Sequence, residues 1–461
     1  MSSVDLSKLR KESYRPKSTN EIVESVNNDS EDFEDVVSID NSFSDTNVQF
    51  VDEYIIIEWK NLIKELKSKS TLNSYVLNSN KSLTSLSKLN NFLKSAPANS
   101  DIERLWVIFL WLTHKIEFDV VKVSETKNEK SVDQLLRRGK MNGLGYCKIF
   151  KKLCELNNIE CILIYGYAKG FGYKVLRKFV NTNHIWVSVK INNDWKLIDV
   201  AWAAGYCTEY IEFVQEFQPY YFFTPPEIFI FQHYSEKYQL QENKLTLEQF
   251  TQMPLLRIDY FLYEIHFLNY SSLNFVKKNP FIAEFKALSD IKLAADLCER
   301  NGKIIDNSIL TQQNYKTHNH EVTIHVPRLN DYFIRVYACR ENDENFKWVG
   351  DFAIQLDDSL HINFFQWCQS FTVPNKYVYL MCPKKQLLRT HESIEYKIYV
   401  RNAISVILID ELTNIKRLEL SESEKDIWCT QYCNKTKGEL KLSAKFENNG
   451  PFFTAFSYTF I

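Results

Sequence analysis

The stretch NHIWVSVKINNDWKLIDVAW, residues 183–202, decides the fold of this chain. Two runs rich in β-branched and aromatic residues, 184–191 and 195–200, flank the polar turn Asn192-Asn193-Asp194. This arrangement is typical of a β-hairpin, because polar turn residues reverse the chain between two half-buried strands. The hairpin predicts an antiparallel sheet in the middle of the chain.

The sequence before the hairpin predicts one more strand and several helices. Cys161–Tyr167 reads as a strand, and the apolar residues of Tyr146–Leu156 recur at helical spacing. Further upstream, Asn99-Ser100-Asp101 offers N-cap residues for an apolar helix at Ile102–Lys115, and Leu83–Leu93 predicts another helix. A helix packed on an antiparallel sheet defines an α+β module.

The character of the chain changes after Pro225-Pro226, where strands begin to dominate. Turns separate these strands at intervals typical of β-sandwiches. The predicted strands are Glu321–Val326, Tyr332–Cys339, Trp348–Leu356, Tyr377–Met381, Ile394–Val400, Ser405–Ile409, Leu440–Phe446 and Phe452–Ile461. We therefore predict a disordered acidic tail at 1–50, an α+β domain at 51–245, and two β-sandwich domains at 246–357 and 358–461.

Composition excludes several classes of function. The 461 residues carry a net charge of −2, with an isoelectric point near 6.5, so no global electrostatic attraction to nucleic acid is expected. The 11 glycines form no Gly-rich phosphate-binding pattern. Met1–Asn20 lacks an apolar signal segment, and the longest apolar run, Leu105–Leu112, is too short to span a bilayer. We predict a cytoplasmic protein with no membrane span.

The cysteines and histidines predict neither a metal site nor a cofactor. The ten cysteines include no CxxC pair, and Cys429 and Cys433 lack the companions that a zinc site needs. In a cytoplasmic chain we expect reduced thiols. His318, His320 and His325 are close in sequence, but no carboxylate–histidine pattern completes a site.

His184 and Asp199 are the residues that suggest chemistry, at the start of one predicted strand and the end of the next. A Cys-His-Asp centre needs a thiol at a helix start, an imidazole that takes its proton, and a carboxylate that orients the imidazole. A histidine facing an aspartate on the next strand is also a common hydrogen-bonded structural pair. Without a thiol, the residues favour that second interpretation.

Several motifs together resemble one family. Gly145-Tyr146, Asn183-His184-Ile185-Trp186 and the run 195–202 resemble the nucleophile helix, the histidine strand and the aspartate strand of transglutaminase-like proteins. The set, which runs from about residue 83 to 237, is similar to the kyphoscoliosis-peptidase branch of that superfamily. The run 329–338 is similar to the β-sandwich repeats of the branch. The resemblance implies a papain-like core, with a helix packed on an antiparallel sheet, followed by two Ig-like β-sandwich domains.

The resemblance also implies that the catalytic cysteine is missing. In such proteins the nucleophile lies two residues before the Gly-Tyr pair, and that position is Gly143 here. Glycine has no nucleophile, so His184 and Asp199 would be vestigial. Two further departures agree: Ile185 follows the histidine where the family has a small residue, and Val187 follows the tryptophan where it often has Asn.

Two alternatives remain open at this level. Cys147 lies one helical turn beyond Gly143 and would be the nucleophile of a residual thiol peptidase or acyl-transferase, with His184 and Asp199. It falls inside the helix, however, where the terminal N–H groups that depress a thiol pKa have faded. The other alternative is a small ligand held in the emptied cleft.

The first hypothesis is therefore a catalytically inactive scaffold that binds protein partners. The resemblance implies cytoskeletal partners, including actin-crosslinking proteins of the filamin type, and a cytoskeleton-associated location. The edge strands of the predicted sandwiches are the surfaces that would make such contacts.

Overall fold

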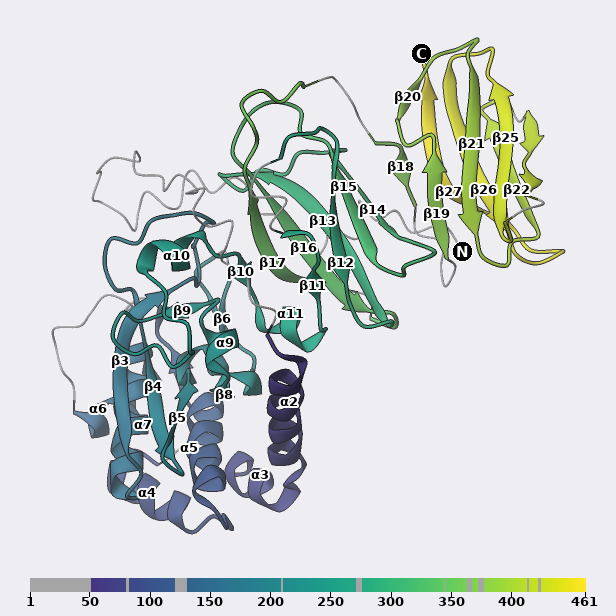
Figure 1. The fold of residues 1–461 in the computed structure, drawn as a ribbon. Helices are drawn as coiled ribbons and strands as arrows, with labels where there is room; N and C mark the ends of the chain where they lie inside the picture. Colours follow the sequence, from purple (N-terminus) through teal and green to yellow (C-terminus); the bar gives the residue numbers. More distant parts are fainter. Residues whose placement is uncertain are drawn as a thin grey trace. The chain divides into compact units, whose positions relative to one another are not determined.

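The computed structural model describes residues 51–461 except 80–82, 121–130, 209, 271–275, 344, 363–366, 372–376, 413 and 422–423. The predicted acidic tail lies outside the described residues. The described chain divides into two compact units, 51–262 and 263–461. Figure 1 shows helices and a sheet in the first unit and β-strands in the second.

A five-stranded antiparallel sheet forms the centre of the first unit, with the strand order β8-β5-β4-β3-β9. Its strands are β3 (Cys161–Ala168), β4 (His184–Ile191), β5 (Asp194–Ile198), β8 (Phe222–Thr224) and β9 (His233–Tyr234). The predicted hairpin is the β4–β5 pair. Asn192 and Asn193 both have positive φ, 52° and 68°, as the tight turn of such a hairpin requires.

Helices surround this sheet, and α7 (Gly143–Leu156) packs against β3 and β4. Helix α5 (Asp101–Lys115) contacts α7 and is buried almost continuously from Glu103 to Thr113, as its apolar sequence predicts. The side chain of Ser100 caps α5 by accepting a hydrogen bond from the N–H of Glu103. The other helices of this unit are α2 (Glu53–Ser68), α3 (Ser70–Leu77), α4 (Leu86–Lys94), α6 (Val132–Arg138), α8 (Val200–Ala204), α9 (Pro226–Phe229), α10 (Leu247–Gln252) and α11 (Ile258–Leu262).

Two further groups of strands follow in the second unit. In the first group, β16 lies between β13 and β17, and β11-β12-β15-β14 form a second sheet. In the second group, β18-β27-β26-β22-β23 form one sheet, with β20 beside β27, and β19-β21-β25-β24 form the other. Their longer strands are β12 (Phe281–Lys286), β13 (Ile291–Glu299), β14 (Ile309–Gln313), β15 (His320–Ile324), β16 (Tyr332–Arg340), β17 (Lys347–Ile354), β19 (Val378–Cys382), β21 (Ser393–Val400), β22 (Ser405–Asp410), β25 (Ile427–Cys433), β26 (Gly438–Lys445) and β27 (Phe452–Phe460). Their shorter strands are β11 (His266–Phe267), β18 (Gln369–Ser370), β20 (Leu387–Leu388), β23 (Ile415–Arg417) and β24 (Glu419–Leu420).

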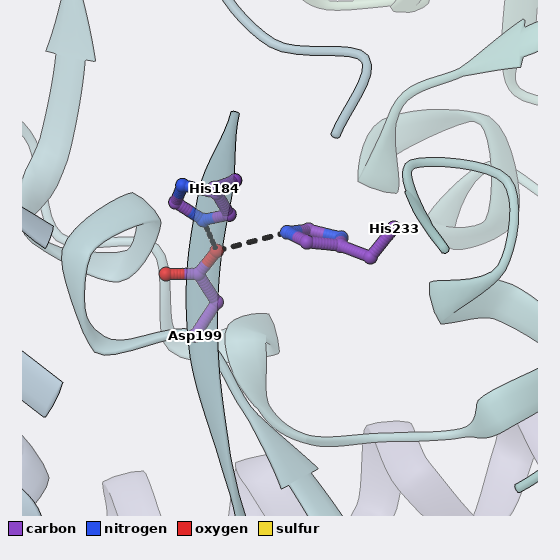
Figure 2. A group of neighbouring side chains, drawn as sticks. All are labelled: His184, Asp199 and His233. Carbon is purple, nitrogen blue, oxygen red and sulfur yellow. Dashed lines mark hydrogen bonds and ion pairs between the residues drawn. The ribbon is translucent and has the colours of Figure 1, made fainter. Parts of the chain in front are cut away.

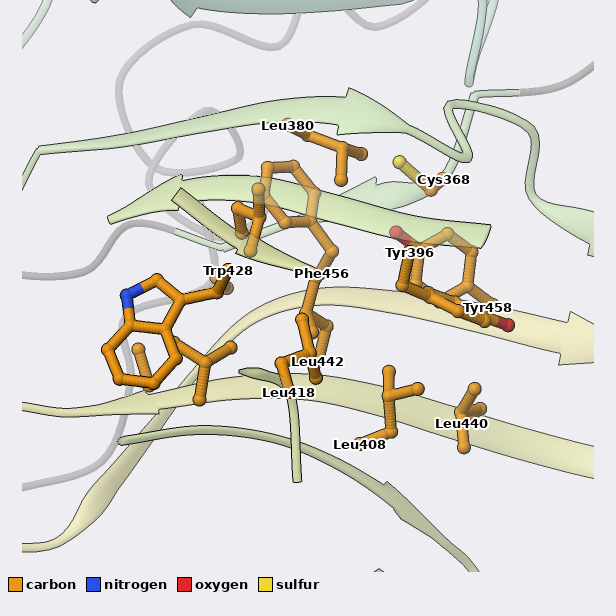
Figure 3. Packing of buried hydrophobic residues seen from close by; sticks show 14 of the residues in the cluster. Cys368, Leu380, Tyr396, Leu408, Leu418, Trp428, Leu440, Leu442, Phe456 and Tyr458 are labelled. Carbon is orange, nitrogen blue, oxygen red and sulfur yellow. The ribbon is translucent and has the colours of Figure 1, made fainter. Parts of the chain in front are cut away.

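The core of the second group is apolar and aromatic (Figure 3). Tyr396 and Tyr458 meet edge to face, with ring centroids 5.6 Å apart, and Leu440 and Leu442 are fully buried beside them. This is the packing expected between the two sheets of a sandwich, in which alternate residues of each strand point inward.

The fold class is confirmed: an α+β domain is followed by a β-rich region. Sequence reasoning missed the strands β12, β13, β14 and β25. Strand β13 has the sequence IKLAADLCE, and eight of its nine residues are buried, so it lacks the alternation of a half-exposed strand. Within the described residues, no helix is long and apolar enough to cross a membrane. All ten cysteines are free thiols.

Candidate functional site

Two imidazoles of the first unit converge on one carboxylate oxygen. Oδ2 of Asp199 lies 2.6 Å from Nε2 of His184 and 2.9 Å from Nε2 of His233. In Figure 2 the two imidazoles approach the carboxylate from different sides. The histidine–aspartate pair predicted from the sequence therefore forms, and a second histidine joins it.

The carboxylate of Asp199 also caps the start of a helix. Asp199 ends the hairpin and is the N-cap of α8, where its Oδ1 accepts a hydrogen bond of 3.0 Å from the N–H of Trp202. An N-cap aspartate is fixed in orientation by such a bond. One oxygen of Asp199 thus fixes the backbone, and the other faces the histidines.

Strand β3 lies between the strands that carry the two imidazoles. His184 pairs with Gly166, and His233 pairs with Ala168, so all four residues lie on the same face of the sheet. Gly166 leaves no room for a side chain, because a Cβ there would come within 2.4 Å of Cη2 of Trp186. The ring centroids of His184 and His233 are 5.4 Å apart.

The site holds one negative charge in a buried environment. Burial opposes the charge of Asp199, but the facing imidazoles of His184 and His233 outweigh it and hold the pKa of this carboxyl below its ordinary value. Burial lowers the pKa of His233 to about 4, against the attraction of Asp199, so His233 is neutral at pH 7. Asp199 is therefore ionised and accepts both hydrogen bonds.

Gly143 opens onto the ring of His184. It is the first residue of α7, whose N-cap Asn142 accepts a hydrogen bond from the N–H of Gly145. A Cβ atom built on Gly143 would lie 3.9 Å from Cε1 of His184 and 3.6 Å from Cγ2 of Ile185. Those are ordinary van der Waals contacts, so a side chain at this position would fit and would touch the imidazole.

Cys147, the substitute nucleophile considered above, is fully buried. Its Sγ donates a weak hydrogen bond to the backbone oxygen of Ile185 at 3.5 Å. Burial, reinforced by the charge of Asp199, raises the pKa of this thiol well above its ordinary value. The thiolate, which is the reactive form, is therefore disfavoured at Cys147.

Trp202 forms one wall of the site. Its ring centroid lies 5.1 Å from that of His184 and 4.4 Å from that of His233. Gly170 lies against its far edge, because a Cβ there would come within 2.9 Å of Cζ2. Trp186 is buried on the same side as His184, with centroids 6.2 Å apart.

His233 is the site residue that sequence reasoning missed. It lies in the apolar run Phe229-Ile230-Phe231-Gln232-His233, 34 residues beyond Asp199. A single histidine in such a run is usually a core residue, so the sequence carried little signal. Its position opposite Ala168 on the neighbouring strand places it on the same face of the sheet as His184.

Comparison with known families identifies the class of these domains. Residues 91–200 match the transglutaminase-like superfamily, and residues 247–364 match the KY-like, immunoglobulin-like domain. The chain thus contains a transglutaminase-like domain, with Gly143, His184 and Asp199 inside the matched segment, followed by an Ig-like domain. His233 lies outside that segment.

Individual relatives point the same way. Kyphoscoliosis peptidase of Mus musculus is 34% identical over 159 residues, which cover 33% of this chain and 24% of the relative. The Homo sapiens protein of that name is 33% identical, with the same coverage. Hillarin of Drosophila melanogaster is 28% identical over 183 residues, or 36% of this chain and 22% of the relative. The matches span about a quarter of the length of these relatives.

Proposed function

We propose that this chain is a catalytically inactive transglutaminase-like protein that acts as a protein-binding scaffold. In this account Gly143 occupies the position of the catalytic cysteine, and His184 and Asp199 are what remains of the catalytic centre. The observation that carries the proposal is the 3.9 Å between a Cβ at position 143 and Cε1 of His184. A cysteine there would be in contact with its base, and glycine supplies no nucleophile.

The competing function is a residual thiol peptidase or acyl-transferase that uses Cys147. Its sulfur would need to be ionised and within reach of the imidazole. The hydrogen bond from Cys147 to the backbone of Ile185, its complete burial and its raised pKa all count against that role. We therefore prefer the catalytically inactive scaffold to the residual thiol enzyme.

An enzymatic assay separates these two functions. The full chain is tested for hydrolysis of a mixed peptide library and for incorporation of a fluorescent amine into glutamine-containing peptides, beside the Cys147→Ala variant. The proposal predicts no turnover by the wild-type chain above the level of the buffer. Turnover that disappears in Cys147→Ala would overturn it in favour of the residual enzyme.

The scaffold role rests on exposed strand edges and on the cytoskeletal partners that the family resemblance implies. Strand β23 (Ile415–Arg417) ends the order of its sheet and all three of its residues are exposed, with Ile415 at 60%. An exposed edge offers unpaired backbone groups to an extended segment of another protein. We propose that such surfaces bind cytoskeletal proteins in the cytoplasm.

Co-sedimentation tests this second element. The full chain is centrifuged with actin filaments, alone and with an actin-crosslinking protein of the filamin type. We expect saturable pelleting in at least one of the two mixtures. Absence of the chain from both pellets would reject the cytoskeletal assignment and leave the catalytic inactivity of the chain unaffected.

A further inference from the structure

The second histidine has no evident part in a cysteine-based centre. A base needs one carboxylate to orient it, and His184 already has Asp199. His233 approaches the same oxygen, is fully buried, and comes from a different strand. Such a group calls for an explanation of its own.

The nitrogen of His233 that faces away from Asp199 is the second unusual feature. Nε2 of the neutral ring must carry the proton that it donates to Asp199, so Nδ1 is a bare acceptor. This Nδ1 is buried and has no hydrogen-bond partner among the described residues. The backbone of Phe229 approaches the ring closely enough to raise its pKa, yet makes no well-aligned bond with Nδ1. The arrangement leaves an acceptor buried without a donor.

We propose that His184, Asp199 and His233 bind a divalent transition-metal ion of the zinc type. Two imidazole nitrogens and one carboxylate oxygen form a donor set that catalytic zinc sites use, with a fourth position left to water. Iron(II) also takes this set, whereas calcium and magnesium prefer oxygen ligands. The inference does not depend on whether the chain is an enzyme or a scaffold.

Coordination would require the three ligand atoms to move to the spacing of a metal site, which includes bringing the two histidine nitrogens, now within 4.8 Å of each other, toward about 3.3 Å. One atom from each residue belongs to a group in which all lie within 4.8 Å of one another. Zinc bonds of about 2.0–2.1 Å in a tetrahedron hold the ligand atoms roughly 3.3 Å apart. The distances of 2.6 and 2.9 Å to Asp199 would therefore open by less than about 1 Å, within the reach of side-chain rotation.

Metal binding would also give the unpaired Nδ1 of His233 a hydrogen-bond partner. When a metal takes Nε2 of a neutral histidine, the proton moves to Nδ1, where a backbone carbonyl is the usual acceptor. In His233 that proton would point toward the backbone of Phe229. Asp199 is held by the N–H of Trp202, which is the support that a ligating carboxylate commonly has.

Solvent reaches the cluster at His184. The side chain of His184 is 13% exposed, while those of Asp199 and His233 are at 0%. We therefore expect the fourth ligand, a water molecule, to approach the metal from the exposed side of His184.

A buried water molecule is the competing explanation for the bare nitrogen. A cavity of about 10 Å³ is lined in part by Trp186 and His233, which is roughly the room that one water needs. A water there would donate to Nδ1 without any metal. In that case added zinc would have no effect on the folded protein.

Equilibrium dialysis with elemental analysis tests the proposal on the full, tag-free chain. Zn²⁺ is the first probe, Co²⁺ provides an absorption spectrum that reports tetrahedral coordination, and Ca²⁺ serves as the hard-cation control. The variants are His184→Gln, which removes the partly exposed ligand, and His361→Gln, which removes an exposed histidine outside the cluster. Circular dichroism confirms that each variant is folded.

We expect one Zn²⁺ or Co²⁺ per chain, a tetrahedral Co²⁺ spectrum, and no stoichiometric Ca²⁺. His184→Gln should weaken Zn²⁺ binding by about 100-fold or more, because even changes behind the ligands cost about 10–100-fold. His361→Gln should bind as the wild type does. Absence of stoichiometric zinc, or equal affinity in His184→Gln and the wild type, would overturn the proposal.

Discussion

Gly143 and Gly166 are both neighbours of His184, but a Cβ atom would fit at only one of these two positions. Gly166 is the strand partner of His184, and a Cβ there would come within 2.3 Å of the backbone oxygen of Tyr234 and 2.4 Å of Cη2 of Trp186. A Cβ on Gly143 meets its nearest neighbour at 3.6 Å. Packing requires glycine at 166 and does not require it at 143.

This difference shows which of the two glycines is required by packing. The backbone oxygen of Tyr234 cannot move aside as a flexible side chain can, so position 166 is closed to larger residues. Position 143 begins a helix, has ordinary φ, and would hold a Cβ atom at ordinary van der Waals distances from its neighbours, including the imidazole of His184. The absence of a side chain at 143 therefore calls for an explanation other than packing, and the loss of a nucleophile is the one we propose.

Gly166→Ala should give the largest effect. We expect a loss of about 3 kcal/mol or more in the free energy of unfolding, at the upper end of the usual cost of overpacking, because one contact is with backbone. Urea denaturation of the full chain, followed by tryptophan fluorescence, measures it. A loss below about 1 kcal/mol would mean that the sheet yields at this point and that the contrast with Gly143 is weaker than described.

His233 should make stability depend on pH. Its folded pKa of about 4 lies below the ordinary value of 6.5, so between these limits the unfolded chain binds more protons. The contribution of His233 to the free energy of unfolding is complete above pH 6.5. It is lost as the pH falls toward 4, by about 3 kcal/mol in all, at about 1.4 kcal/mol per pH unit. Asp199, whose pKa is held below 3.8, adds its own loss only in more acidic solution.

Urea midpoints from pH 7.5 to 4.5 check this prediction in the wild type and in His233→Gln. Burial also lowers the pKa of His320 to about 4, so part of the slope should survive in His233→Gln and part should be lost in His320→Gln. Identical slopes in the wild type and His233→Gln would contradict the neutral, buried state of His233.

Cys147→Ala should have a smaller effect on stability and none on reactivity. Removing a buried sulfur and its weak bond to Ile185 should cost about 1 kcal/mol. Native wild-type protein treated with iodoacetamide should be labelled at the exposed Cys433 and spared at Cys147, as mapped by mass spectrometry. If Cys147 were labelled as fast as Cys433, the result would favour the residual enzyme that uses Cys147.

Gly143→Ala should change least. The added methyl group fits, and alanine loses less backbone freedom than glycine on folding, so we expect stability to stay within about 1 kcal/mol of the wild type, on the favourable side. The same urea measurement tests it. A destabilisation comparable to that of Gly166→Ala would show that glycine at 143 is a packing requirement after all.

The sequence predicted the local features of this site better than its long-range ones. The hairpin, the helix at Tyr146–Leu156, which begins at Gly143 in the structure, and the facing of His184 and Asp199 follow from periodicity and turn residues over short distances. The burial of Cys147 and the arrival of His233 depend on packing between segments far apart in the chain, which periodicity does not encode. The missed strand β13 has the same origin, since burial of both its faces removes the alternation.

The most direct test restores the missing atom. Gly143→Cys is treated with iodoacetamide at pH 6, where an unperturbed thiol is almost entirely protonated, beside the wild type and Gly143→Cys with His184→Ala. Our account predicts labelling of residue 143 at least about tenfold faster than of any native cysteine, and loss of that advantage without His184. A cysteine at 143 that reacts no faster than Cys433, with or without His184, would contradict the claim that Gly143 occupies a vacated nucleophile position.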